Sequence, residues 1–174
     1  GKWDIAFLAI DPTRAAVVDF TAPYLDAHNG VIAAPKSGID RLEALDQPAR
    51  RIGVGARDAV DLHLSRTLAH AVLVRNAEGL SGAIGLLRSG AVDAFAANGE
   101  RLAELLTAVP EWRRVPGSVL AVRQAIALPK GRRAAREYLD AFLHRMRDRG
   151  TIEQLIAAHG IRDATPAATI GATR

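Results

Sequence analysis

The residue best suited to chemistry is an arginine that follows a short apolar run. Arg14 ends the segment Asp11-Pro12-Thr13-Arg14, directly after the apolar run Ile5–Ile10. A guanidinium offers planar, bidentate donors to a carboxylate, so an arginine at a strand end can bind an anionic ligand. Asp11 is most simply the N-cap of a short helix that Pro12 begins. From these residues alone, an exposed arginine on that helix is the preferred interpretation.

Two further polar positions also follow predicted strands. Arg57-Asp58 comes after the expected strand 51–56, and Asn98 comes after the expected strand 92–97. Asp58 suits the N-cap of the helix that follows, which is the simpler explanation for it. Arg57 could fill a cleft or bind an acid.

Catalytic and metal sites are not indicated. Asp61, His63 and Ser65 have the residue types of a triad, but they stand at alternate positions of a predicted helix. His63 then points away from the side that Asp61 and Ser65 share, so the three cannot form a chain of hydrogen bonds. The histidines lack the spacing of a metal site, and the absence of cysteine excludes thiolate catalysis and disulfides. We expect no catalytic residue, no metal and no cofactor.

The composition is that of an ordinary globular protein. The 174 residues are 49% hydrophobic and 24% charged, enough for one domain or two small lobes. The formal net charge is +4, but the arginines occur as scattered pairs with acids between them and no interleaved aromatic residues, which argues against nucleic acid as a partner. No apolar run is long enough to span a bilayer.

Strand-like and helix-like segments alternate through the middle of the chain. Strands are expected at 51–56, 71–74 and 92–97, each followed by a helix, and this order predicts an α/β fold with a mostly parallel sheet. A long strand at 119–128 and helices at 133–147 and 151–159 follow. The helix at 133–147 has four residues at core spacing, Ala135, Leu139, Phe142 and Met146. From Asp163 onward the composition predicts a flexible tail, 163–174.

Several ordered motifs together resemble the periplasmic solute-binding proteins of polar amino-acid ABC transporters, solute-binding protein family 3. The family has a strand followed by Thr-Pro-Glu-Arg, then Asp-Phe-Ser-x-Pro-Tyr, then Gly-x-x-Asp-Ala, and a Gly-Thr helix pair near the end. The counterparts here are Asp11–Arg14, Asp19–Tyr24, Gly90–Ala94 and Gly150–Thr151. Each motif alone is weak, but their order and spacing make the combination specific.

The resemblance implies a periplasmic binding protein type II-like fold, with two α/β lobes joined by crossover strands. Lobe 1 would comprise 1–26 and 125–162, and lobe 2 would comprise 31–120. Ala27–Gly30 and Ala121–Gln124 would be the hinges. The family has further strands before the point that matches Gly1, so the first lobe is expected to be incomplete and the precursor to carry a signal peptide.

The resemblance also implies a ligand-binding role for six positions. Arg14 matches the arginine that holds the ligand α-carboxylate, and the segment Phe20–Tyr24 at the family spacing favours this role. Asn98 stands where the family has an aspartate that pairs with the ligand α-ammonium, and Arg57-Asp58 replaces Gly-Thr or Gly-Ser. In the family, threonines are common at the two positions that Ala9 and Asp11 occupy here. These departures leave open a carboxylate ligand without an α-amino group.

The function implied is that of an extracytoplasmic binding component of an ABC importer. It would bind an amino acid or another small carboxylate between two lobes, dock on a membrane permease and act as a monomer in the periplasm. Two alternatives remain. A periplasmic dehydratase-like enzyme on the same fold would need a general acid or base, for which Asp11 and Asp58 are the candidates. An extracellular sensor domain of a receptor is the other.

Overall fold

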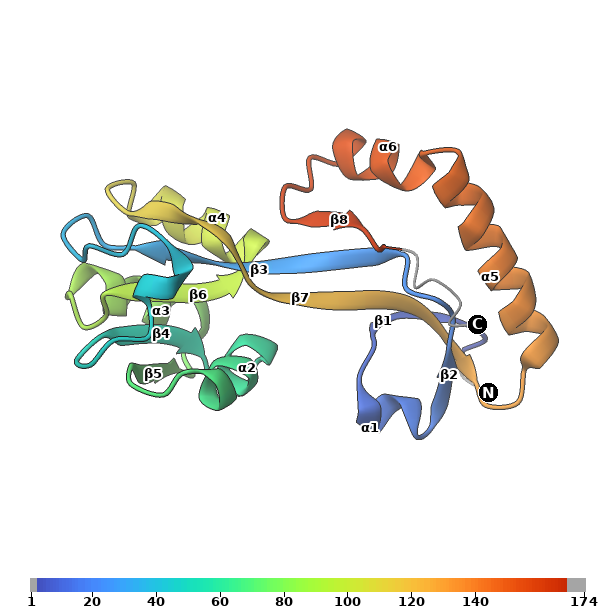
Figure 1. Cartoon of the computed structure of the whole chain (residues 1–174), viewed down its shortest axis with the longest axis horizontal. Coiled ribbons are helices and arrows are strands. Elements are labelled where there is room, and N and C mark those ends of the chain that lie inside the picture. The colour runs from blue at the N-terminus through green and yellow to red at the C-terminus, as the bar shows by residue number, and fades with distance from the viewer. Residues whose placement is uncertain (1–2, 169–174) are drawn as a thin grey trace. The chain divides into compact units, whose positions relative to one another are not determined.

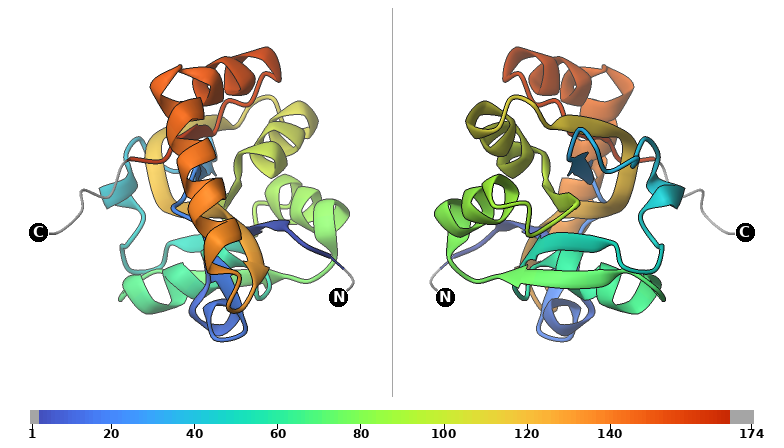
Figure 2. Two further views of the ribbon diagram at one scale, coloured as in Figure 1. Left: turned by 90° about the vertical axis from the view of Figure 1, so that its right-hand side faces the viewer. Right: turned by 90° about the vertical axis from the view of Figure 1, so that its left-hand side faces the viewer.

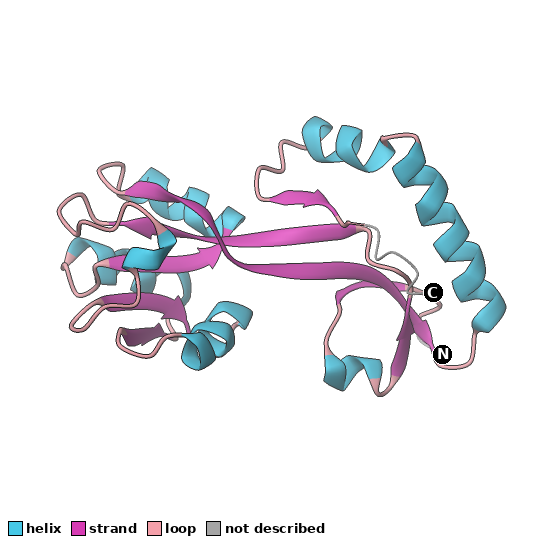
Figure 3. Ribbon diagram, viewed as in Figure 1, coloured by secondary structure: helices cyan, strands magenta, loops and turns pink. Residues whose placement is uncertain are grey.

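The computed structural model describes residues 3–168 and has a mixed α/β fold (Figures 1 and 3). The elements, in chain order, are β1 Ala6–Ala9, α1 Pro12–Ala15, β2 Val18–Phe20, β3 Leu25–Ala33, the 3-10 helix η1 Leu42–Ala44, β4 Arg51–Gly55, α2 Ala59–Thr67, β5 Val72–Asn76, α3 Gly79–Arg88, β6 Ala94–Asn98, α4 Gly99–Ala108, β7 Arg113–Pro129, α5 Arg133–Asp148, α6 Thr151–Ala158 and β8 Ala164–Pro166. The α/β class expected from the sequence is confirmed.

The chain forms two compact units. The first unit comprises the described parts of 1–27 and 122–174, and the second unit comprises His28–Ala121. The chain passes between them twice, in β3 and in β7, and each of these strands continues unbroken through the boundary. The boundaries fall within the two segments expected to be hinges. Bending at those segments stays a prediction.

A parallel sheet with connecting helices organises the second unit. β4 pairs in parallel with β5 and with β6, and β3 adds an antiparallel strand beside β6. Each parallel strand runs directly into the next helix: β4 into α2, β5 into α3 and β6 into α4 (Figure 1). This arrangement brings the N-termini of three helices to the carboxyl ends of three strands.

Apolar side chains bury both faces of this sheet. Because side chains alternate along a strand, Val31 and Ile32 of β3 belong to different cores. One core also contains Ile52, Val54 and Leu64, and the other contains Phe95, Leu102 and Leu105. Gly53 of β4 lies directly under the ring of Phe95, since a Cβ atom at position 53 would stand 2.4 Å from Phe95 Cδ2.

The first unit consists of short strands paired with the two long ones. β1 and β2 pair antiparallel with β7, and β8 pairs antiparallel with β3. α5 leads directly into α6 (Figure 2), and Gly150 between them has a left-handed φ of 64°, which glycine adopts without steric cost. The buried apolar cluster is small, with Ile126, Leu128 and Leu143 at its centre.

Two expectations for this unit were wrong in detail. On α5 the structure buries Leu143 and leaves Ala135 and Phe142 exposed, because Leu143 is the α5 residue that packs in the small cluster with Ile126 and Leu128. The tail expected from 163 includes the strand β8, whose Ala164 is paired with Ala27 and buried. Residues 169–174 of the expected tail lie outside the described residues. Within 3–168, no helix combines the length and the apolar character needed to cross a membrane.

Candidate functional site

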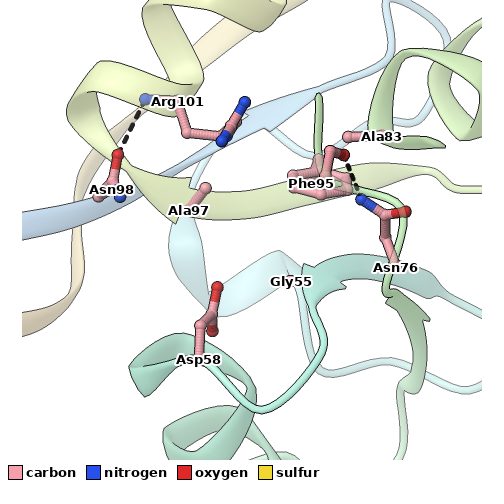
Figure 4. Close-up of a pocket in the computed structure, with 9 residues that line it drawn as sticks. Gly55, Asp58, Asn76, Ala83, Phe95, Ala97, Asn98 and Arg101 are labelled. Atoms are coloured by element: carbon pink, nitrogen blue, oxygen red, sulfur yellow. Dashed lines mark hydrogen bonds between the residues drawn. The ribbon is translucent and has the colours of Figure 1, made fainter. Parts of the chain in front are cut away.

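A pocket lies in the second unit at the carboxyl ends of β4, β5 and β6 (Figure 4). Its volume is about 170 Å³. Its floor is formed by apolar or small residues, including Gly55, Phe95 and Ala97. Four polar side chains complete the lining: Asp58, Asn76, Asn98 and Arg101. The pocket therefore combines an apolar floor with one carboxylate, one guanidinium and two amides, a lining suited to a small polar molecule.

The polar residues stand where they do because three helices begin at the pocket. Asp58 is the N-cap of α2, and Asn98 is the N-cap of α4. Asn76 ends β5, and its side chain holds the turn into α3 by donating to Gly79 O at 2.6 Å and accepting from Glu78 N at 3.1 Å. The first N–H groups of a helix have no intrahelical acceptor and carry a partial positive charge, so this edge favours anionic groups.

Asn98 uses its acceptor atom within the protein. Its Oδ1 accepts a hydrogen bond from Arg101 N at 2.8 Å, which caps α4. The amide nitrogen remains to contact a ligand, and that nitrogen is a donor. The family resemblance puts Asn98 where an aspartate accepts from the ligand ammonium, and leaves open whether Asn98 makes that contact. In the structure it is better placed to donate.

Asp58 divides its two oxygens between the helix and the pocket. Oδ1 accepts from Asp61 N at 2.8 Å and caps α2. Oδ2 lies over Gly55, so close that a Cβ atom at that position would stand 2.5 Å from it. Among the described residues, no cation forms an ion pair with Asp58. The N-cap expected from the sequence is therefore present, and one carboxylate oxygen remains available at the pocket.

Arg57 does not line the pocket. It adopts a left-handed φ of 64°, and its side chain is exposed. Its backbone N–H donates to Asp61 Oδ2 at 2.9 Å, and the bend that this contact stabilises places Asp58 at the helix start. The structure thus gives Arg57 a role in the turn, and its side chain is not brought together with Asp58 and Asn98.

Asp61 is the centre of a buried hydrogen-bond network below this turn. It is 4% exposed and accepts from Ser65 Oγ at 3.1 Å and from Arg75 Nε at 2.9 Å. Burial raises the pKa of Asp61, but the hydrogen bonds from Arg57 N and Ser65 and the charge of Arg75 outweigh it, so the pKa is lowered. Asp61 and Ser65 share one side of α2, as the spacing predicts, and the network has no triad geometry.

Arg101 is a lining residue that the sequence did not single out. It lies one turn into α4, and its guanidinium donates to Glu104 Oε2 at 2.8 Å. Figure 4 shows Arg101 and Asp58 on different sides of the pocket, with Ala97 between them. The signal that could have found Asn76 and Arg101 is topological: both follow the end of a predicted parallel strand, where ligands bind in open α/β sheets.

The other three predicted site residues contact one another in the first unit. Arg14 Nη1 donates to Ala9 O at 3.1 Å, and the remaining guanidinium N–H groups have no described partner. Asp11 caps α1 by accepting from Thr13 N at 2.8 Å and from the Thr13 hydroxyl. That hydroxyl and the backbone N–H groups of Arg14 and Thr13 lower the pKa of Asp11. Arg14 is exposed and retains donors for an anion.

No group of three or more acidic or histidine side chains able to hold a metal occurs among residues 3–168. The site residues offer charges and hydrogen-bonding groups to a ligand. Arg14, with its free guanidinium donors, lies in the first unit. A carboxylate, a guanidinium and two amides line the pocket of the second unit.

Residues 1–160 match the family described as bacterial extracellular solute-binding proteins, family 3. No curated protein sequence matches the chain.

Several solved structures have the same fold. One is an arginine-bound substrate-binding protein of an amino-acid ABC transporter from Streptococcus pneumoniae, with 22% identity and a TM-score of 0.64. That match covers 91% of this chain and 68% of the other. The solute receptor for L-cysteine from Neisseria gonorrhoeae has 20% identity and TM-score 0.63, with 91% and 64% covered. An ancestral amino-acid-binding protein, a precursor of cyclohexadienyl dehydratase, has 22% identity and TM-score 0.64, with 91% and 68% covered. The chain spans about two thirds of each.

Proposed function

Because the chain belongs to family 3 of the bacterial extracellular solute-binding proteins, we propose that it is the binding component of an ABC importer and that its ligand is an amino acid or another small carboxylate. The observation that carries the proposal is the pocket of the second unit. It combines three helix N-termini with a guanidinium and an apolar floor, which is suited to a small polar molecule with an anionic group.

Arg14 is proposed to hold the ligand carboxylate. Its free guanidinium donors support this role, since a bidentate pair with a carboxylate is among the stronger polar contacts in proteins. That Arg14 and the pocket contact the same ligand rests on the family resemblance. The periplasm as location, a membrane permease as partner and a monomeric state are proposed on the same ground.

Ligand binding tests the proposal directly. The unfolding temperature of the chain is measured with each standard L-amino acid and with small mono- and dicarboxylates, and we expect at least one compound to raise it. Arg14→Ala should weaken the binding of that compound by about ten- to a hundred-fold, the worth of a charge-assisted hydrogen bond. Arg133→Ala is the matched control, because Arg133 is an exposed arginine of the same unit that pairs with Glu137. A panel without a single stabilising compound would end the proposal.

An enzyme on the same fold is the second candidate function. The observation that favours it is the free oxygen of Asp58 at the pocket, since a general acid or base must face its substrate. One structural neighbour is described as a precursor of a dehydratase. Incubating the chain with each compound that binds, followed by NMR of the small molecule, separates the candidates: an importer component returns the compound unchanged.

A further inference from the structure

The two N-caps at the pocket present different atoms to a ligand. Asn98 engages its neutral oxygen with Arg101 N, so that oxygen has one lone pair left beside the two N–H donors of the amide, which an ammonium group cannot use. Asp58 spends one oxygen on Asp61 N and keeps the other, which lies over Gly55 at the pocket floor. The charged and therefore stronger acceptor at this site is the carboxylate of Asp58.

We infer that Asp58 selects a ligand with a protonated amino group, and that it supplies the negative charge which Asn98 lacks. The inference deepens the proposed function and rests on it. It assigns the ligand to molecules that carry both an ammonium and an anionic group, and it excludes simple carboxylates as the main ligands. Asp58 is a specificity-determining residue in this role.

The charges around the pocket fit such a dipolar ligand. Asp58 is the one acidic residue of the lining, and Arg101 is the one basic residue. Arg101 already pairs with Glu104 at 2.8 Å, while no described cation pairs with Asp58. A carboxylate without a counter-ion beside a small pocket attracts a cationic group. Arg101 and the amide nitrogen of Asn98 remain for an anionic or carbonyl oxygen of the same molecule (Figure 4).

Substitutions at Asp58 can remove its negative charge and still leave α2 with an N-cap. Asn and Ser are both good N-caps, so Asp58→Asn and Asp58→Ser keep an acceptor for Asp61 N while they abolish the carboxylate. A purely structural Asp58 would tolerate both changes without any change in ligand preference. A recognition residue would not.

The test compares L-amino acids with their 2-hydroxy acid counterparts, which have a hydroxyl in place of the ammonium. Binding is measured by calorimetry on the whole chain. Wild type should bind the amino acid at least about tenfold more tightly than the hydroxy acid, from the loss of one charged hydrogen bond. In Asp58→Asn and Asp58→Ser this preference should fall to about threefold or less. Asp40→Asn, which removes an exposed carboxylate of the same unit, is the control and should leave the preference unchanged.

Each other outcome overturns the inference in a distinguishable way. Equal affinity of wild type for amino and hydroxy acids rejects it and needs no variant. Equal loss of both ligands in Asp58→Asn shows that Asp58 acts only through the helix start. An unchanged preference in both Asp58 variants assigns the ammonium to another residue. In these three cases the binding function stands. If wild type binds no compound of either series, the inference falls together with the proposed function.

Discussion

The two units differ sharply in how much apolar side chain they bury. The second unit has two clusters, and Ile32, Ile52 and Leu102 are almost completely buried in them. The first unit has one cluster with three buried members. Among the described residues, the large hydrophobic side chains that stay exposed are mostly in the first unit: Trp3, Ile5, Phe7, Ile10, Val17, Tyr138, Phe142, Leu155 and Ile161, against Leu62 and Val72 in the second.

Hydrogen bonds connect α5 to the rest of the first unit. The Asp140 side chain accepts from Ala22 N at 2.7 Å, and Arg147 Nη2 donates to Pro23 O at 2.9 Å, so α5 is tied to the segment after β2 by hydrogen bonds. Such bonds contribute less to net stability than burial of large side chains. The second unit therefore supports its pocket on a well-buried core of its own. The first unit presents Arg14 from a more exposed framework.

The largest expected effect comes from one substitution made in both units. Phe95 is 2% exposed and Phe142 is 38% exposed. Phe95→Ala should cost about 3–5 kcal/mol of unfolding free energy, because it leaves a cavity against Gly53. Phe142→Ala should cost about 1 kcal/mol or less, because its ring already contacts solvent. Urea unfolding followed by circular dichroism measures both, and similar losses would remove the contrast between the units.

A smaller effect is expected at Asp61, where the second unit buries a charge. Asp61→Asn should cost about 1–3 kcal/mol, because Arg75 loses its ionic partner and the single amide oxygen can accept from only one of Arg57 N and Ser65 Oγ, which bond to different oxygens of Asp61. The lowered pKa of Asp61 also sets a pH dependence. The unfolded chain binds a proton near the ordinary aspartate pKa while the folded chain stays ionised. Stability from Asp61 is therefore complete above that pKa and is lost as pH falls through the folded value.

The measurement is the unfolding free energy from neutral pH down to about pH 3, a window that spans the ordinary aspartate pKa. Wild type should lose stability more steeply than Asp61→Asn as the pH falls. Asp40→Asn removes an exposed carboxylate of the same unit and should follow wild type. Parallel curves for wild type and Asp61→Asn would mean that the buried network contributes nothing to the acid sensitivity of the second unit.

The sequence predicts the second unit better than the first. The regular apolar pattern of the second unit both indicates its strands and helices and fills its core. β4, β5 and β6 lie within a few residues of the expected strands, and a helix follows each as expected, because apolar periodicity and caps such as Asp58 agree locally with the fold. β8 and the exposed face of α5 were missed. Their structure depends on pairing with β3 and on the number of apolar partners nearby, which composition does not encode.

The candidate site was likewise predictable only in part. The family resemblance implies a ligand-binding role for Asp58 and Asn98, and the structure places both at the pocket as helix N-caps. Which atom of each faces the pocket was not predictable, because it depends on the hydrogen bonds to Asp61 N and Arg101 N. Arg57 carries the right charge for a binding residue. Its left-handed backbone turns the side chain to solvent, and the sequence gives no sign of this.

The smallest effect tests how closely the second unit is packed beside the pocket. A Cβ atom at Gly53 would stand 2.4 Å from the ring of Phe95, whereas one at Gly85 on α3 would meet nothing within 4 Å. Gly53→Ala should therefore cost about 1–2 kcal/mol, since overpacking outweighs the lost freedom of the unfolded chain. Gly85→Ala should stabilise by about 0.5 kcal/mol, because it only improves helix propensity.

Both variants are compared by thermal unfolding and by affinity for whichever compound wild type binds. Gly53→Ala is expected to weaken binding as well, because displacing Phe95 moves a residue of the pocket floor. Gly85→Ala should leave affinity unchanged. If Gly53→Ala were neutral in both measurements, the ring of Phe95 would be free to shift, and the second unit would not be the rigid support for the pocket that its burial indicates.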